Sequence, residues 1–193
     1  MNGMTVEQPE PVTGKRPPLL VRKAVSTDIE KIALFELDYT TEYVWQMDGA
    51  EGDRQQTVNF RQVRLPRQIR VLPQRDVKRV VRTWQDRRLF IVAERGDRLM
   101  GYLAIDSSTL EDVGWIADLG VDRMYRRQGV GSALLTSAMQ WAAQVGVRRL
   151  VAELQAKNQP GIGFFKQHGF LFCGYNDLYY ANQDVALHFG RNL

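Results

Sequence analysis

Apolar and polar positions in the first third of the chain predict a strand, a helix and a hairpin. Residues 19–24 (LLVRKA) have the composition of a short strand. Residues 26–37 carry apolar side chains at helical spacing, and Thr27 and Glu30 stand at the spacing of a capping box. The stretches EYVWQMD and QQTVNFRQVRL, within residues 42–65, are β-rich and flank the turn sequence GAEGD, which predicts a hairpin.

The rest of the chain alternates between helix and strand patterns. Residues 74–88 place Val77, Val80, Val81 and Trp84 on one face of a strongly basic helix. Further strands are predicted at 89–94, 99–105, 113–121, 149–154, 170–175 and 184–190, with helices at 129–145 and from Pro160 to Gly169. The chain therefore predicts a mixed α/β fold of the α+β class.

Composition narrows the class of protein. The chain has 193 residues, 44% apolar and 25% charged, which suits one globular domain over 19–193. The proline-rich segment 1–18 predicts a disordered tail. No apolar run approaches the roughly 20 residues that span a bilayer, and the single cysteine, Cys173, forms no intrachain disulfide. We expect a cytoplasmic protein with no membrane partner and no metal site.

Charge is distributed unevenly along the chain. Residues 26–53 hold eight acidic side chains against Lys31, and residues 54–98 hold thirteen basic side chains against four acidic ones. The acidic segment can attract a cationic ligand through its long-range field. The basic segment, with Trp84, leaves open a nucleic-acid or ribosome-associated binding module, although the apolar stripe of its helix predicts that Trp84 is buried.

The segment after the strand at 113–121 has the features of an anion site. Gly129 and Gly131 open the following helix and leave its first main-chain N–H groups uncovered, with Arg126, Arg127 and Ser132 beside them. A P-loop is excluded, because no lysine occurs between Arg98 and Lys157. A dinucleotide fingerprint is excluded too, because Leu134 stands where the third glycine is needed.

Two motifs resemble those of the GNAT superfamily of N-acyltransferases. Arg126-x-x-Gly129-x-Gly131 is similar to the acetyl-coenzyme A motif Q/R-x-x-G-x-G/A, and the segment from Asn158 to Phe170 is similar to N-x-x-A-x-x-x-Y-x-x-x-G-F. The resemblance covers about residues 89–190. It implies a mostly antiparallel central sheet, flanked by helices and splayed between its fourth and fifth strands, to which this chain adds the early hairpin.

The resemblance also implies acetyl-coenzyme A (acetyl-CoA) as the acyl donor. The backbone of Leu119 and Val121 would pair with the pantetheine arm, and the amides of 127–132 would hold the pyrophosphate. The implied cofactor-binding residues are Leu119, Gly120, Val121, Arg126, Arg127, Gln128, Gly129, Val130, Gly131, Ser132, Asn158 and Phe165.

The implied reaction is direct attack of an amine on the thioester in a ternary complex, with a strand N–H such as that of Leu119 or Gly120 stabilising the oxyanion. Asp118 and Glu153 are the carboxylates nearest this centre in the family layout. Strand alternation predicts that Ala117, Leu119 and Val121 share one face, and that Asp118 points to the other.

Phe165 stands where the family often has a tyrosine that protonates the departing thiolate. Tyr175 is the catalytic candidate that we put forward in its place. Tyr179, Tyr180 or water are alternatives, and a thiolate can also leave without a general acid.

The acceptor is suggested by a second resemblance. The segments ELDYTTEYVWQMD and LPRQIR and the C-terminal 25 residues look like those of streptothricin acetyltransferases. This implies a small cationic amine as substrate. An alternative substrate is a protein N-terminus or lysine, and an alternative function is a sensor that binds acyl-CoA without transfer. Pairing of exposed strand edges could also form a homodimer. The candidate substrate contacts are Asp38, Tyr39, Glu42, Tyr43 and Trp45.

Overall fold

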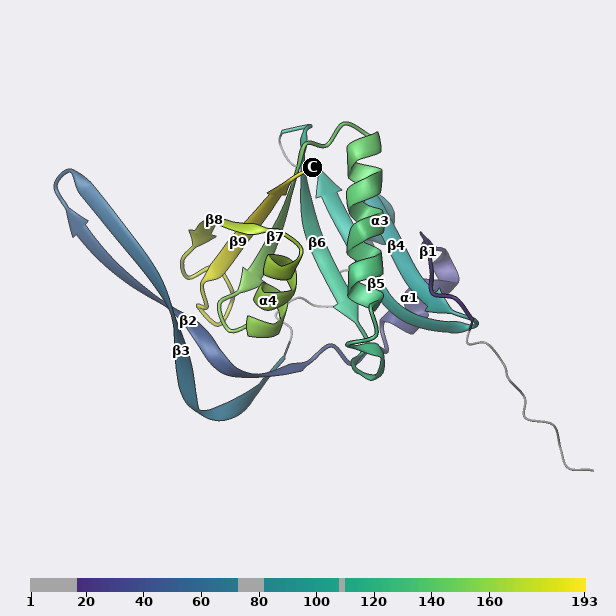
Figure 1. Cartoon of the computed structure of the whole chain (residues 1–193), viewed down its shortest axis with the longest axis horizontal. Helices are drawn as coiled ribbons and strands as arrows, with labels where there is room; N and C mark the ends of the chain where they lie inside the picture. The colour runs from purple at the N-terminus through teal and green to yellow at the C-terminus, as the bar shows by residue number, and fades with distance from the viewer. Residues whose placement is uncertain (1–16, 73–81, 108–109) are drawn as a thin grey trace, which may run out of the picture.

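The structure is a computed structural model that describes residues 17–72, 82–107 and 110–193 (Figure 1). Residues 1–16 of the predicted tail and residues 74–81 of the predicted helix at 74–88 lie outside these ranges. Of that helix, the described part includes the 3-10 turn η1 (Trp84–Asp86).

The centre of the molecule is a seven-stranded sheet in the order β1-β4-β5-β6-β7-β9-β8. Every neighbouring pair is antiparallel except β6 and β7, which are parallel. The predicted mixed fold with a mostly antiparallel sheet is therefore confirmed. The strands are β1 (Leu20–Lys23), β4 (Leu89–Arg95), β5 (Arg98–Ser107), β6 (Val113–Val121), β7 (Arg149–Gln155), β8 (Leu171–Asn176) and β9 (Ala186–Asn192).

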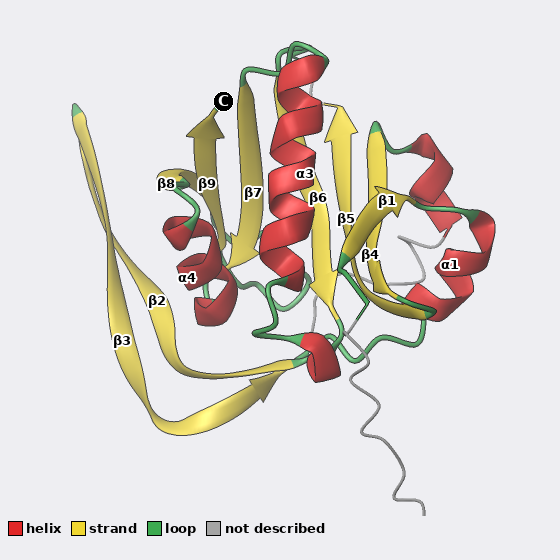
Figure 2. Cartoon of the chain, turned by 45° about the vertical axis from the view of Figure 1, so that its right-hand side comes forward, coloured by secondary structure: helices red, strands yellow, loops and turns green. Residues whose placement is uncertain are grey.

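Helices cover both faces of the sheet (Figure 2). Along β5, Leu103 and Ile105 belong to the core shared with α3 (Val130–Gln144) and α4 (Gln159–Gln167), whereas Tyr102 and Ala104 belong to the core shared with α1 (Ser26–Ile32). This is the two-residue alternation of a strand buried on both sides. In the part of the chain that the structure describes, no helix is long and apolar enough to cross a membrane.

Helix α1 is shorter than predicted and is capped by a different residue. It ends at Ile32 instead of near residue 37. Phe35 and Leu37 reach the core from an irregular segment, so their apolar character did not require a helix. At the other end, the carboxylate of Asp28, not of Glu30, accepts the main-chain N–H of Val25 at 2.9 Å.

The sheet is splayed between β6 and β7, its fourth and fifth strands. The two strands pair only from Val113/Arg149 to Ile116/Ala152, and beyond these residues they diverge. On the other side of β6, Asp118 pairs with Ala104 and Ile116 with Ile105, which leaves Ala117 in a β-bulge. The prediction that Ala117 shares a face with Leu119 and Val121 is wrong, because the extra residue places Ala117 in the core under α1.

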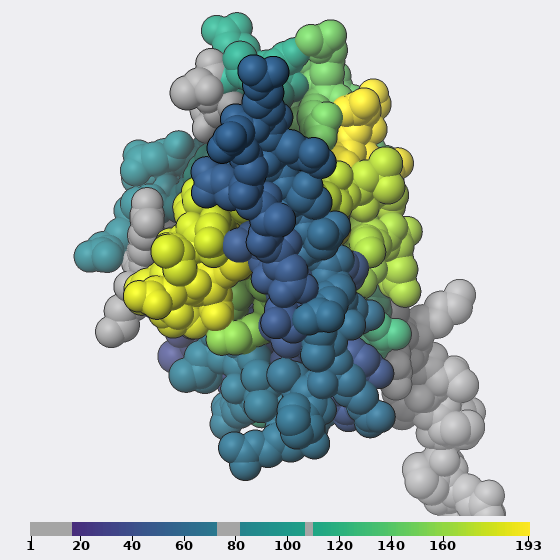
Figure 3. All heavy atoms as spheres, turned by 90° about the vertical axis from the view of Figure 1, so that its left-hand side faces the viewer, coloured from purple at the N-terminus to yellow at the C-terminus, as the bar shows by residue number. Residues whose placement is uncertain are grey.

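The predicted hairpin is present and longer than expected. It is formed by β2 (Tyr39–Gly52) and β3 (Gln55–Val71). Pro66 does not end β3, because it lies in an irregular stretch between the pairs Tyr43/Arg64 and Thr41/Ile69, where no ladder hydrogen bond is needed from it. Figure 3 shows the hairpin as a ridge lying across the C-terminal part of the molecule.

Candidate active site

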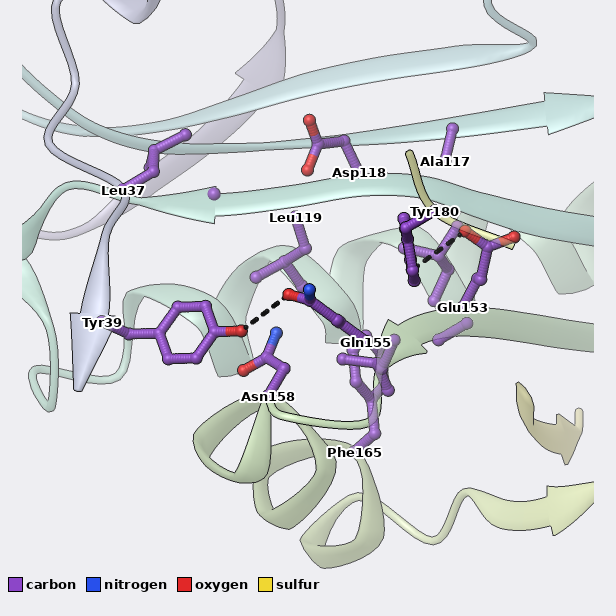
Figure 4. Close-up of a pocket in the computed structure, with 14 residues that line it drawn as sticks. Leu37, Tyr39, Ala117, Asp118, Leu119, Glu153, Gln155, Asn158, Phe165 and Tyr180 are labelled. Atoms are coloured by element: carbon purple, nitrogen blue, oxygen red, sulfur yellow. Dashed lines mark hydrogen bonds between the residues drawn. The ribbon is translucent and has the colours of Figure 1, made fainter. Parts of the chain in front are cut away.

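A cavity of about 140 Å³ lies in the splay between β6 and β7 (Figure 4). One wall is β6, which has no strand partner on the β7 side beyond Ile116. The opposite wall comes from β7, from Asn158 and Phe165 of the α4 region, and from Tyr180 in the β8–β9 connection. An extended ligand can therefore pair with the uncovered edge of β6, as a peptide pairs with a sheet edge. The lining residues are Leu37, Tyr39, Ile116, Ala117, Asp118, Leu119, Gly120, Ala152, Glu153, Leu154, Gln155, Asn158, Phe165 and Tyr180.

The anion site at the start of α3 is built from main-chain groups. Gly129 is the N-cap residue with a φ of 81°, a conformation that favours glycine. At Gly131 a Cβ atom would stand 3.2 Å from the ring of Phe164 in α4, so the absent side chain keeps the two helices close. The first N–H groups of a 15-residue helix point out of this mouth, which suits a pyrophosphate.

Side chains around that mouth are mostly engaged with the protein. Gln128 donates to the carbonyl of Met124 at 3.0 Å, and the hydroxyl of Ser132 lies 3.1 Å from Nε2 of His168. Val130 is buried under the helix. Arg127, which follows the motif arginine Arg126, is exposed and therefore remains accessible to an anion.

Arg126 has a different use from the one predicted. Its guanidinium donates to three main-chain carbonyls, those of Val121 at 3.1 Å, Asp38 at 2.6 Å and Glu36 at 3.1 Å. The side chain therefore fastens the segment before β2 to the end of β6. Its contribution to a cofactor site is to shape the loop that carries the amides.

The two predicted carboxylates occupy different environments. Asp118 accepts the phenol of Tyr102 at 2.8 Å and lies on the opposite side of β6 from Leu119 (Figure 4). Glu153 accepts the phenol of Tyr180 at 3.2 Å, and its other oxygen lies 3.9 Å from Nε2 of His188. Burial lowers the pKa of His188, an effect that the negative charge of Glu153 partly offsets. Glu153 therefore faces a neutral imidazole at neutral pH.

Tyr175, our candidate for the general acid, does not line the cavity. It lies exposed on β8 and packs edge-on against Phe60 of the hairpin, with ring centroids 5.3 Å apart. Tyr180, which we considered as an alternative, lines the cavity instead. Phe165 also lines it and is buried against Phe164 and Phe170.

The five predicted substrate contacts separate into three groups. Tyr39 lines the cavity, where its phenol donates to Gln155 at 3.3 Å and burial raises its pKa. Asp38 is buried between Arg70 and Arg123 and is absent from the cavity lining.

Glu42, Tyr43 and Trp45 lie on the hairpin further from the cavity. Glu42 and Tyr43 line a separate groove of about 390 Å³ together with Arg127 and α4. Trp45 attaches the hairpin to α4, because its indole N–H donates to Gln159 at 2.9 Å and Lys166 lies 4.8 Å from its ring. Trp45 is thus a packing residue.

Several residues of the site were not predicted. Gln155 lines the cavity from β7, and Tyr102 and His188 contact cavity residues from β5 and β9. Leu37 lies 3.1 Å from the position of a Cβ at Gly120. Only the position of Gln155, two residues after Glu153 on the same strand, could have indicated its role.

The alternative of a nucleic-acid module has little support at Trp84. Its ring is half-buried and packs edge-on against Phe90, with centroids 6.3 Å apart. The predicted burial of Trp84 is met in part, and its packing against the core accounts for this side chain without base stacking.

Known proteins are similar to this chain in sequence and in architecture. Residues 58–170 match the family model described as acetyltransferase (GNAT) family. The chain is 30% identical over 95 residues to the streptothricin acetyltransferase of Streptomyces lavendulae, covering 49% of this chain and 50% of that relative. It thus spans about half the length of the curated relatives that it matches.

Solved structures agree with the fold. Nourseothricin acetyltransferase superimposes with a TM-score of 0.77 at 24% identity, covering 90% of this chain and 98% of that one. A Bacillus anthracis protein solved in complex with acetyl coenzyme A gives a TM-score of 0.72 at 17% identity, covering 93% and 99%. With a family model matched over more than half of its length and both motifs at the splayed strands, the chain belongs to the GNAT acetyltransferase family.

Proposed function

We propose that this protein is an N-acetyltransferase that transfers the acetyl group of acetyl-CoA to a primary amine of a small cationic molecule of the streptothricin type. The observation that carries the proposal is the cavity between the splayed strands. It places the uncovered edge of β6 opposite Glu153, Tyr180 and Tyr39, and β6 leads through its last residue, Val121, to the loop before the mouth of α3. The streptothricin and nourseothricin acetyltransferases among the similar proteins support the acceptor class.

The residues fit the cofactor at three places. The uncovered edge of β6 at Leu119 to Val121 suits the amides of a pantetheine arm. The amides of 127–132 suit a pyrophosphate, and the side chain of Asn158, whose oxygen accepts the N–H of Gly161 at 2.9 Å, lies at the cavity.

When bound, acetyl-CoA would supply an acetyl thioester, from which the acetyl group would pass to the amine nitrogen while CoA leaves as the thiol. The main-chain N–H of Leu119 or Gly120 stabilises the negative charge that develops on the carbonyl oxygen. Glu153 takes the proton that the nitrogen loses and returns it through water to the thiolate. Tyr180 holds Glu153 in place with its phenol. Asp118 has a supporting role, because its carboxylate is engaged by Tyr102.

The part of the cavity where we expect the acceptor amine to bind, called the acceptor side, carries the negative charge that suits a cationic substrate. Asp118 and Glu153 line the cavity, and Asp184 lies behind them in contact with Gln155 and, at 2.8 Å, with Nζ of Lys157. A site with an excess of carboxylates concentrates cationic amines.

The direct test is thiol release from acetyl-CoA with streptothricin, spermidine, and peptides carrying a free N-terminus or lysine, alongside calorimetric titration with CoA. Turnover that is fastest with streptothricin is expected. Turnover only with peptides would mean that the acceptor is a protein amine and not a small cationic molecule. CoA binding without turnover of any amine would favour a sensor, and absence of CoA binding would contradict the proposal altogether.

A second test separates the two tyrosines. Tyr180→Phe removes the hydrogen bond to Glu153 and is expected to lower kcat about tenfold, whereas Tyr175→Phe, in the same part of the chain, is expected to leave kcat unchanged. A larger effect at Tyr175 would contradict the assignment of Tyr180.

A further inference from the structure

The short segment 36–39, which leads from the region after α1 into the first residue of β2, contacts both the cavity and the loop before α3. Leu37 and Tyr39 line the cavity on the acceptor side. The segment before Tyr39 is neither helix nor strand, and Leu34 just upstream is 81% exposed. Such a segment depends on contacts from elsewhere for its order.

Those contacts come mainly from the loop that precedes α3. The guanidinium of Arg123 pairs with the carboxylates of Asp38 and, at 3.3 Å, Glu36, and the N–H of Arg123 donates to the carbonyl of Glu36 at 3.1 Å. Arg126 donates to the carbonyls of Glu36 and Asp38, as described above. The same loop leads directly into the amides proposed to hold the pyrophosphate.

Asp38 is the centre of this junction. Its side chain is 9% exposed and also pairs with Nε of Arg70 in β3 at 2.5 Å. Hydrogen bonds from Arg123 and Arg70 lower the pKa of Asp38 to about 2, so its carboxyl is ionised at neutral pH. One carboxylate thus connects the cofactor loop, the acceptor wall and the end of the hairpin.

We propose that Asp38 is a positioning residue that makes the acceptor wall at Leu37 and Tyr39 depend on the cofactor loop, so that CoA bound at the loop orders this wall. The inference rests on the proposed function, because it takes the loop to be the CoA site. It replaces our expectation that Asp38 touches the substrate. A loop whose amides are engaged by a pyrophosphate moves less, and the Arg123–Asp38 and Arg126–carbonyl bonds transmit that restraint to the segment.

The coupling can be measured without knowing the acceptor. Amide hydrogen exchange is followed in peptides covering 36–44 and 123–132, with and without saturating CoA, while calorimetry gives the CoA affinity. In the wild-type protein CoA is expected to slow exchange in both regions, by about tenfold in 36–44, which is within the usual range of coupling between sites.

Variants separate positioning from general stability. Asp38→Asn is expected to bind CoA within about threefold of wild type and to keep the protection of 123–132 but lose that of 36–44. Arg123→Gln should give the same loss, whereas Arg70→Gln, which removes only the hairpin contact, should retain the protection. Asp112→Asn is the matched control, because Asp112 pairs with Arg148 at the opposite end of β6.

Each outcome bears on the proposal. Selective loss of protection in 36–44 for Asp38→Asn and Arg123→Gln supports it. CoA binding that protects 123–132 and leaves 36–44 unchanged in the wild type overturns it, as does full protection in Asp38→Asn. If the wild-type protein does not bind CoA, the proposed function fails first, and the coupling fails with it.

Discussion

The cofactor segment, residues 117–132, and the hairpin of β2 and β3 present functional groups in opposite ways. In the cofactor segment the groups that we propose for binding belong to the main chain: the uncovered edge of β6 and the first amides of α3. On the side of the hairpin the groups are side chains brought together from distant positions, such as Tyr39 with Gln155 and Tyr180 with Glu153. A site built from main-chain groups of one continuous segment can be recognised in the sequence as a short motif. A site built from side chains that are far apart in the sequence cannot.

The largest effect is expected on the side-chain half of the cavity. Glu153→Gln keeps the shape of the side chain and removes the proton acceptor, so kcat should fall about 100-fold or more. Asp118→Asn should cost less, because Tyr102 already engages that carboxylate. Thiol-release kinetics with saturating acetyl-CoA measures both. A greater loss of kcat for Asp118→Asn than for Glu153→Gln would mean that Asp118, and not Glu153, accepts the proton.

Attachment of the hairpin should depend on one aromatic side chain. Trp45→Ala removes the hydrogen bond to Gln159 and the contact with Lys166, and should lower the free energy of unfolding by about 2 kcal/mol, less than a fully buried tryptophan would cost. Gln46→Ala, the exposed neighbour, should change it by less than about 0.5 kcal/mol. Urea denaturation compares the two. Equal effects would mean that the hairpin is not held through Trp45.

The backbone character of the cofactor site can be tested by comparing a glycine with an arginine. Gly131→Val places a branched side chain against Phe164 at the helix mouth and should weaken CoA binding about tenfold, the order of cost of an overpacked contact. Arg127→Gln removes one exposed charge and should weaken binding less than about fivefold. Calorimetric titration with CoA measures both affinities. A larger loss of affinity for Arg127→Gln than for Gly131→Val would mean that CoA is bound mainly by side-chain charge.

The smallest expected effect is the pH dependence at His188. Burial lowers the pKa of His188 in the folded state below its ordinary 6.5, so the unfolded chain binds the proton more readily. Its contribution to stability is complete above pH 6.5 and is lost as the pH falls from there through the folded-state pKa. His188→Gln should reduce the decline of the unfolding free energy between pH 6.5 and 5. An unchanged decline would locate the titrating group elsewhere.

Local patterns were sufficient where a feature depends on neighbouring residues. The strand that ends at Val121 and the helix opening through Gly129 and Gly131 were predictable, because strand alternation and glycine conformation act within a few residues. The hairpin turn was predicted at GAEGD but lies at residues 53–54, because β2 continues to Gly52 and pairs there with Gln55. The end of α1 was not, since Phe35 and Leu37 are buried whether the segment is helical or not.

The sequence by itself determined the family, the glycine loop that opens α3 and the mixed sheet, because these follow from short-range patterns. Only the tertiary structure decided which of several equivalent side chains share the cavity. Tyr180 lines the cavity and Tyr175 does not. Asp38 pairs with Arg70 and Arg123, and Arg126 donates to main-chain carbonyls. The physical reason is that each of these choices depends on a partner 25 or more residues away, or on a single bulge residue, Ala117, that shifts the facing of a strand.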